Sequence, residues 1–160
     1  MVRLDEAAAS VQPVLGLDLF RRGNVPPLNA VRGEERLICS VFGLLNLLIK
    51  QGIACTFVYR SADGSTLCES VDNPDYPDQL LLKVLAVNVV PDVRVDIRSA
   101  STSVCACVIA TTDAGAGFSE LIDAIENKDN ISIIGLSAAS QNSTSAPMWY
   151  LDEENNFVMV

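Results

Sequence analysis

The sequence predicts an α+β (mixed α/β) fold: one domain, with a mixed β-sheet of about six to seven strands and three to four helices packed on it. A chain of 160 residues that is 49% apolar and 19% charged has room for one hydrophobic core and too little charge for a disordered protein. Segments with the patterns of helices and strands alternate along it. Residues 104–111, 118–127 and 131–136 read as a strand, a helix and a strand, the order of a right-handed βαβ unit.

The first 32 residues predict a short helix and an apolar arm. Residues 4–12 favour a helix that Pro13 ends. Residues 13–32 contain two glycines and two further prolines, which exclude one long helix and indicate an extended segment. Because this segment is too apolar for a free tail, we expect residues 1–32 to pack on the domain or on a partner. Residues 33–160 then form the α/β domain.

The next element is a strongly apolar helix. Glu34 and Glu35 suit its first turn, and Gly52 suits the position just after its end. Apolar residues point around most of its circumference, which predicts a central helix or one with a face against another chain. Gly43 would permit a close helix approach.

The remaining elements follow from turn residues and periodicity. Asp63-Gly64 predicts a hairpin turn, and Asp78 suits the N-terminus of a helix over 79–88. The strict alternation of residues 93–98 predicts a strand with one wet face. Residues 148–151 and 156–160 predict a closing hairpin around residues 152–155.

Composition excludes several classes of chemistry. The chain has no histidine, so Ser-His-Asp and Cys-His catalysis, His-ligated zinc and imidazole pH switches are absent. Its net charge of −9 is unevenly placed: residues 1–60 carry seven bases and five acids, and residues 61–160 carry four bases and fifteen acids. Such a distribution keeps a protein in solution, or allows docking on a basic partner.

The cysteines indicate a reducing, cytoplasmic compartment. There are five of them, and none forms a CxxC pair: Cys39, Cys55, Cys68, Cys105 and Cys107. We expect reduced thiols in the core. Cys105 and Cys107 share one strand face and could hold a soft metal only with ligands from elsewhere. No signal peptide is visible, and the longest apolar stretch, residues 37–49, is too short to span a membrane.

One loop is a candidate ligand site. Residues 111–120 join a predicted strand to a predicted helix, where glycines allow backbone amides to converge on an anion. The side chains and glycines that would serve such a site are Thr112, Asp113, Gly115, Gly117 and Ser119. The third glycine of a dinucleotide motif and the lysine of a P-loop are both missing. A plain strand-to-helix turn uses the same residue types.

Two charged stretches have ordinary alternatives. Glu69, Asp72, Asp75 and Asp78 could bind a cation, but they lack EF-hand spacing and suit turns and helix caps. The only basic stretch that could contact nucleic acid contains Arg21, Arg22, Arg32 and Arg36, but arginines spaced in this way more often form ion pairs with acidic neighbours or with a subunit. We therefore expect neither a metal nor a cofactor.

These observations favour a non-enzymatic protein–protein interaction or assembly module, an oligomeric (homodimeric) accessory subunit of a cellular or viral complex. The expected interface residues are Phe20, Phe42, Gly43, Phe157, Val158 and Val160. An apolar edge strand at residues 157–160 must be covered or recruit a partner, so deleting residues 156–160 should cause aggregation or loss of self-association. The alternative is a small-ligand or phosphate/nucleotide-binding domain, perhaps enzymatic, built on loop 111–120.

Overall fold

The computed structural model describes residues 12–20, 27–61, 63–86, 93–100, 106–123, 125, 130–136 and 146–159. These residues form one seven-stranded sheet in the order β3-β2-β1-β4-β5-β6-β7. Its strands are β1 Val14–Asp18, β2 Cys55–Arg60, β3 Thr66–Val71, β4 Cys107–Thr111, β5 Ile131–Gly135, β6 Met148–Leu151 and β7 Phe157–Met159. With three α-helices in the described residues, the predicted α+β fold with a mixed sheet is confirmed.

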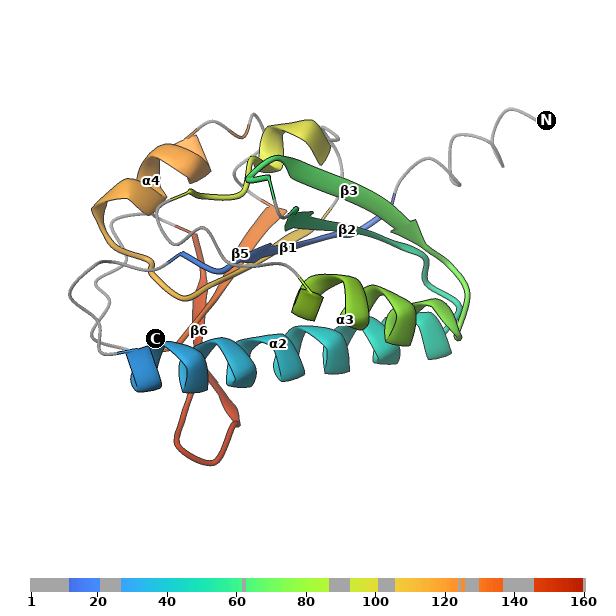
Figure 1. Ribbon diagram of the computed structural model, residues 1–160, viewed down its shortest axis with the longest axis horizontal. Coiled ribbons are helices and arrows are strands. Elements are labelled where there is room, and N and C mark those ends of the chain that lie inside the picture. Colours follow the sequence, from blue (N-terminus) through green and yellow to red (C-terminus); the bar gives the residue numbers. More distant parts are fainter. Residues whose placement is uncertain are drawn as a thin grey trace.

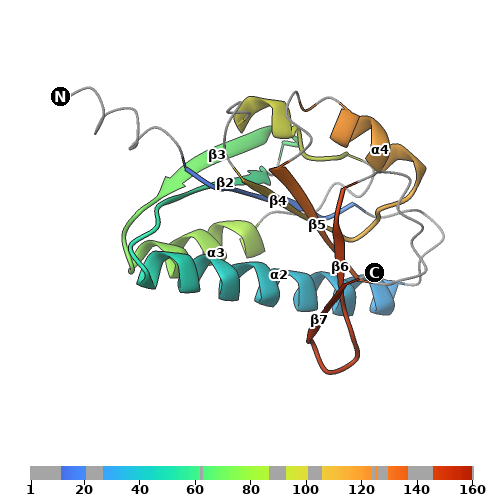
Figure 2. The same ribbon diagram turned by 180° about the vertical axis from the view of Figure 1, so that it is seen from behind.

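Five inner strands run parallel and an antiparallel strand closes each edge. Strand β1 pairs with β2 on one side and with β4 on the other, while β3 and β7 return as hairpin partners of β2 and β6. The helices are α2 Pro27–Lys50, α3 Tyr76–Ala86 and α4 Ala116–Asp123. Helices α2 and α3 lie on one face, and α4 lies with the short 3₁₀ helix η1 (Ile97–Ala100) on the other (Figures 1 and 2).

Residues 14–18, expected to be extended and packed on the domain, are the central strand of the sheet, and residues 27–32 belong to α2, so no separate arm spans residues 13–32. All five residues of β1 are buried. Since a strand between two helix layers is apolar on both sides, it shows no alternation and resembles an apolar linker in sequence. Any larger residue at Gly16 would force Ile97 to move, because a Cβ atom there would lie 2.5 Å from Ile97 Cδ1. The domain thus begins before residue 33, the boundary drawn from sequence.

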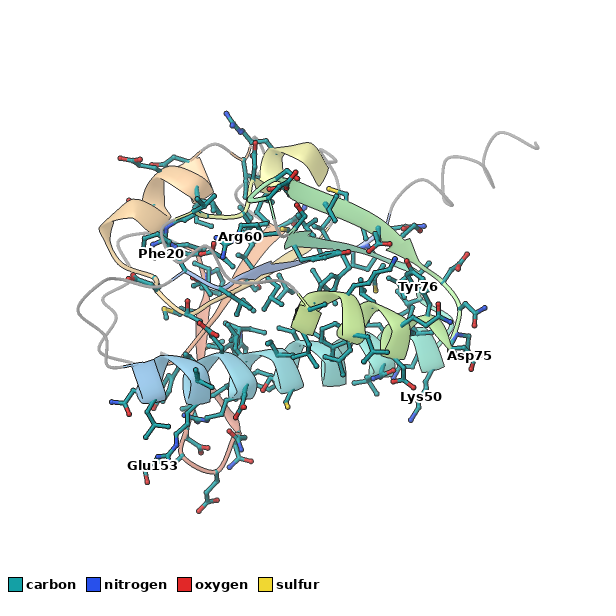
Figure 3. The ribbon with its side chains drawn as sticks, in the orientation of Figure 1. Phe20, Lys50, Arg60, Asp75, Tyr76 and Glu153 are labelled. Carbon is teal, nitrogen blue, oxygen red and sulfur yellow. The ribbon has the colours of Figure 1, made fainter. Side chains whose placement is uncertain are left out.

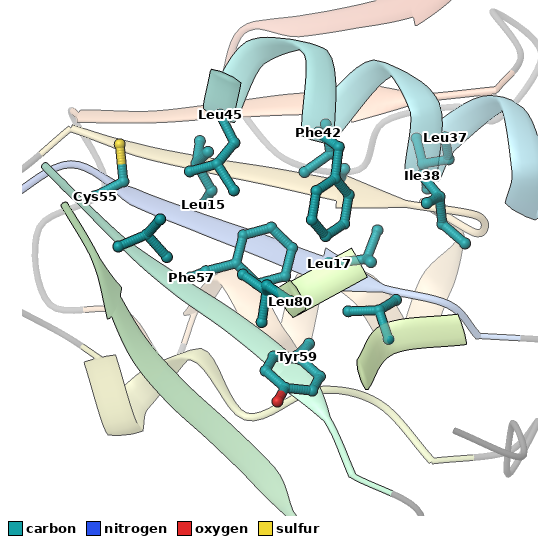
Figure 4. Close-up of a cluster of buried hydrophobic side chains, with 14 of the residues drawn as sticks. Leu15, Leu17, Leu37, Ile38, Phe42, Leu45, Cys55, Phe57, Tyr59 and Leu80 are labelled. Atoms are coloured by element: carbon teal, nitrogen blue, oxygen red, sulfur yellow. The ribbon is translucent and has the colours of Figure 1, made fainter. Parts of the chain in front are cut away.

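Helix α2 begins seven residues before Glu34 and covers one face of the sheet. Leu37, Leu45 and Phe42 are buried against β1 and β2, and the Phe42 and Phe57 ring centroids are 5.2 Å apart (Figure 4). The helix is not buried all round, since Leu47 on its outer side is 53% exposed. Gly52 follows its end with φ +78°, and its N–H donates to Ile49 O, as the sequence predicted.

The second core lies beneath α4. Phe118 and Ile122 of α4 are buried against the sheet with Val95 and Ile97. The strand predicted over residues 93–98 was wrong: residues 93–96 are irregular and η1 follows. The alternation of apolar and polar residues nevertheless predicted correctly that Val95 and Ile97 face the core. Side chains rather than a neighbouring strand accept two amides of this segment: Asp18 accepts from Val95 N and Thr66 from Asp96 N.

Both predicted hairpins are confirmed. Strands β2 and β3 meet at a turn in which Gly64 has φ +86°, and Asn155, at φ +64°, completes the turn between β6 and β7. The βαβ unit is also present as β4, α4 and β5, with β4 and β5 parallel. The helix expected over residues 4–12 lies outside the described residues. No helix of the described part is long and apolar enough to cross a membrane.

Candidate functional site

The topology places one crevice where ligands commonly bind in sheets of this kind. Strand β1 leads into α2 on one face and β4 leads into α4 on the other, so the chain diverges at their carboxyl ends. Asp18 ends β1 and Thr111 ends β4, and the two residues are paired in the ladder. We call this region the β1–β4 crevice.

Asp18 is the centre of the crevice and is only 1% exposed. Its Oδ2 lies 2.7 Å from Arg94 Nη1 and accepts a 2.8 Å hydrogen bond from Thr111 Oγ1, while its Oδ1 accepts a 3.1 Å bond from Val95 N. Burial raises the pKa of the Asp18 carboxyl, and Arg94 and these hydrogen bonds offset part of that rise. A buried carboxylate held this way is a structural anchor between β1, β4 and residues 93–98.

Arg94 occupies the rest of the crevice. Its Nη1 also donates to Asp113 O at 2.9 Å, and its Nη2 lies 3.7 Å from Asp113 Oδ1. The guanidinium carbon lies 4.1 Å from the Phe20 ring centroid and 5.6 Å from that of Phe118. A cation supplied by the chain itself thus sits between two carboxylates and two aromatic rings. Arg60, labelled with Phe20 in Figure 3, donates from its Nη2 to the carbonyl oxygen of Leu19, the residue before Phe20.

The structure brings the predicted loop residues to this crevice, but it uses them internally. Thr112 N donates to Asp18 O at 3.1 Å, and its hydroxyl bonds to Phe20 O. Asp113 Oδ1 accepts from Gly115 N at 2.7 Å, which directs this amide at the chain's own carboxylate. The geometry therefore matches the plain strand-to-helix turn.

The other two predicted positions belong to α4. Gly117 lies beside Arg94, whose Nε is 3.7 Å from where a Cβ atom would stand. Ser119 is half-buried in the same helix. Sequence reasoning missed Asp18 and Arg94, the two central groups. An acid directly after an apolar run was the available signal for Asp18; Arg94 had none beyond its place in an alternating segment.

A shallow hollow of about 360 Å³ adjoins the crevice between residues 94–98 and α4. Arg94, Arg98 and Glu120 line it, so its charges are mixed. Arg98 is already paired with Asp96, its Nε lying 2.9 Å from Oδ1. This hollow offers no concentrated positive charge to an anion.

One of the acidic residues considered for a cation, Glu69, already binds three side chains of the protein. Glu69 accepts hydrogen bonds from Tyr59 at 2.5 Å, from Lys83 at 2.9 Å and from Tyr76. Burial acts to raise the Glu69 pKa, but these bonds outweigh it and the net pKa is lowered. No group of three potential metal ligands occurs among the described residues.

The cysteines divide between core and surface. Cys55 and Cys107 are buried, as expected, and burial raises the pKa of the Cys55 thiol to about 11. Cys39 and Cys68 are exposed, which corrects the expectation of core thiols throughout. They lie on the solvent sides of α2 and β3. Cys105 lies outside the described residues.

A second feature lies on the α2 face, where β4 to β7 extend beyond the helix. An open groove of about 320 Å³ is lined by Leu44, Val108, Ser132, Ile134, Trp149 and Phe157. We call it the apolar groove. Val108, Ser132 and Ile134 come from β4 and β5, whereas Leu44 comes from α2. Trp149 and Phe157 belong to the β6–β7 hairpin, which crosses α2 in both ribbon views (Figures 1 and 2).

The β6–β7 hairpin is fixed to α2 by an arginine. Arg36 Nε donates to Asn155 Oδ1 at 2.8 Å, and its Nη2 donates to the carbonyl oxygens of Leu151 and Asp152. Arg36 thus has a structural role, but through an amide oxygen and two carbonyl oxygens rather than through the ion pairs that the sequence suggested. Arg32 is exposed, and Arg21 and Arg22 lie outside the described residues.

The expected interface residues occupy different environments. Phe42 belongs to the core and Phe20 packs on Arg94. Gly43 is open on the outer side of α2. Phe157 is 46% exposed beside half-buried Val158, and Val160 lies outside the described residues. Phe157, Val158 and Gly43 therefore remain accessible.

Comparison with known proteins gives no relative: no family model, curated protein or solved structure matches the chain. The function must therefore be inferred from these two regions.

Proposed function

We propose that this chain is a non-enzymatic protein–protein interaction module, an accessory subunit that joins a larger assembly through the apolar groove. The observation that carries the proposal is the lining of the groove: five of its six residues are apolar or aromatic, and it is open. Exposed apolar surface beside an aromatic anchor is typical of binding sites for proteins.

The layer arrangement supports this proposal. Parallel strands are normally covered by helices on both faces. Helices α2 and α3 together cover the β1–β2–β3 side, whereas among the described segments only the first half of α2 crosses β5, β6 and β7 on that face (Figure 2). The surface left there continues past the groove to Met159, which is 58% exposed and paired with Trp149.

The β1–β4 crevice supports the proposal by weakening its alternative, because Arg94 already fills the crevice. A ligand entering the crevice would have to displace Arg94 from Asp18 and Asp113. Leaving a buried carboxylate without its partner costs several kcal/mol, on the order of 3–5 kcal/mol for a broken buried pair. A small-molecule function built on loop 111–120 is therefore the weaker alternative.

A pair of site-specific photo-crosslinkers tests the proposal. A benzophenone amino acid replaces Leu44 in the groove, and a matched variant replaces Leu85, which is 58% exposed on α3. After irradiation in the source cells, mass spectrometry identifies the protein joined at each position. We expect a discrete adduct from position 44 only.

The identified protein is then purified and titrated against the chain. Trp149 is the only tryptophan, so its emission reports on the groove directly. We expect a shift to shorter wavelength on binding, and a dissociation constant raised at least about tenfold by Leu44→Glu. Equal adducts at both positions, or unchanged affinity in Leu44→Glu, would contradict the proposal. The proposal would also be contradicted if the chain were a monomer, if a nucleotide raised its melting temperature, and if no protein bound at the groove.

A further inference from the structure

Strand β7 leaves one of its two edges unpaired. It is the last strand of the sheet, bonded to β6 alone in the described structure. Asp152 N donates to Asn156 O, which makes residues 152 and 156 a hydrogen-bonded pair. Because bonded and non-bonded pairs alternate in an antiparallel ladder, the backbone groups of Val158 turn towards Tyr150. Those of Phe157 and Met159 therefore turn outward.

The side chains of β7 do nothing to block this edge. Natural sheets protect their edges with charges, proline, bulges or a covering segment. Strand β7 consists of Phe157, Val158 and Met159, with no charge and no proline. Its apolar side chains on the α2 face are the exposed Phe157 and Met159.

The opposite edge is protected. Strand β3 carries Glu69, and Thr66 accepts a hydrogen bond from Asp96 N, so residues 93–98 approach its end. The contrast makes β7 the edge at which a further strand can add to the sheet.

We propose that β7 pairs with β7 of a second copy of this chain, antiparallel about a two-fold axis at Val158. This inference rests on the proposed function, and it identifies a second copy of the chain as the partner that binds beside the apolar groove. Phe157 of one copy would then exchange N–H···O bonds with Met159 of the other, and the reverse. These are the two residues whose backbone groups face outward, so the two-fold pairing satisfies both of them.

The side chains and charges fit this arrangement. Pairing Phe157 with Met159 of the second copy places an aromatic ring beside a thioether on the α2 face, a favourable contact. The acidic residues of the hairpin, Asp152, Glu153 and Glu154, lie in the turn before β7. In an antiparallel pair the two turns lie at opposite ends, so like charges stay apart. The two grooves then share one continuous apolar face.

Sedimentation velocity of the full chain tests the proposal from micromolar to millimolar concentration. We expect the mass to rise from 17.1 kDa towards twice that value. Met159→Pro removes the outward N–H but not the inner ladder, and should raise the dimer dissociation constant at least about tenfold. Met159→Leu keeps the N–H and should leave the constant within about twofold of the unchanged chain.

A second pair of variants guards against misfolding. Phe157→Glu should give a monomer, whereas Leu82→Glu, at a 69% exposed site on α3, should still dimerise. Circular dichroism confirms that each variant is folded. A mass of 17.1 kDa at every concentration, or a dimer unaffected by Met159→Pro and Phe157→Glu, would overturn the inference. If the unchanged chain is a monomer but position 44 crosslinks to another protein, the proposed function stands and only the second copy is excluded.

Discussion

The β1–β4 crevice and the apolar groove differ in which groups are exposed to water. In the crevice, polar groups are buried and each has a partner: Arg94 and Thr111 both bind the carboxylate of Asp18. In the groove, apolar groups such as Trp149 and Phe157 remain partly in water. Removing a member of the first set should mainly lower stability, while altering the second should mainly change association. This contrast separates a structural site from the surface that we propose for association.

The largest expected effect is at Arg94. Arg94→Ala would leave the Asp18 carboxylate buried without its cation, lowering the free energy of unfolding by about 3–5 kcal/mol. Urea denaturation measures the change. Arg98→Ala is the matched control, because the exposed Arg98–Asp96 pair contributes about 0–1 kcal/mol. If both variants lose the same amount, the crevice is not the structural centre that its burial indicates.

A pair of glycine variants gives the next largest effect. The pair compares a buried glycine in the core with an open glycine on the outer side of α2. Gly16→Ala places a methyl group against Ile97 in the core and should cost about 1–3 kcal/mol. Gly43→Ala meets nothing within 4 Å on the outer side of α2 and should add about 0.5–1 kcal/mol through helix propensity. Thermal unfolding of both variants measures the two changes in stability. A destabilised Gly43→Ala would show that this side of α2 is not open in the free chain.

The smallest effect concerns two carboxyls in opposite environments. Asp63 lies in the exposed β2–β3 turn, where hydrogen bonds from Ser61 and Ser65 lower its pKa to about 2. Its contribution to stability is therefore present above pH 3.8 and is lost as the pH falls towards 2. Asp18 has a raised pKa, so its contribution is greatest below pH 3.8 and decreases as the pH rises.

Carbon-13 NMR titration of the aspartate carboxyls measures both values. The Asp63 midpoint should lie near 2 and move upward in Ser61→Ala, while the Asp18 midpoint should lie above 3.8. An Asp63 midpoint unchanged by Ser61→Ala would show that the turn hydrogen bonds do not hold its charge.

Local signals predicted much of the fold. Asp63-Gly64 marked one hairpin, Gly52 marked the end of α2, and the strand–helix–strand pattern of β4, α4 and β5 was correct. Each of these depends on backbone conformation or periodicity, which neighbouring residues determine.

The sequence by itself determined the types of most elements, the absence of histidine chemistry and the apolar character of the closing strand. Only the tertiary structure decided that residues 14–18 are the central strand, because burial on both faces removes the alternation that marks a strand. It also decided that residues 93–98 are not a strand, since the amides of Val95 and Asp96 donate to the side chains of Asp18 and Thr66. Asp18 and Arg94 stand 76 residues apart, and their meeting follows from packing that no local pattern encodes. The same holds for Leu44 and Phe157, which line one groove only because α2 and the β6–β7 hairpin cross.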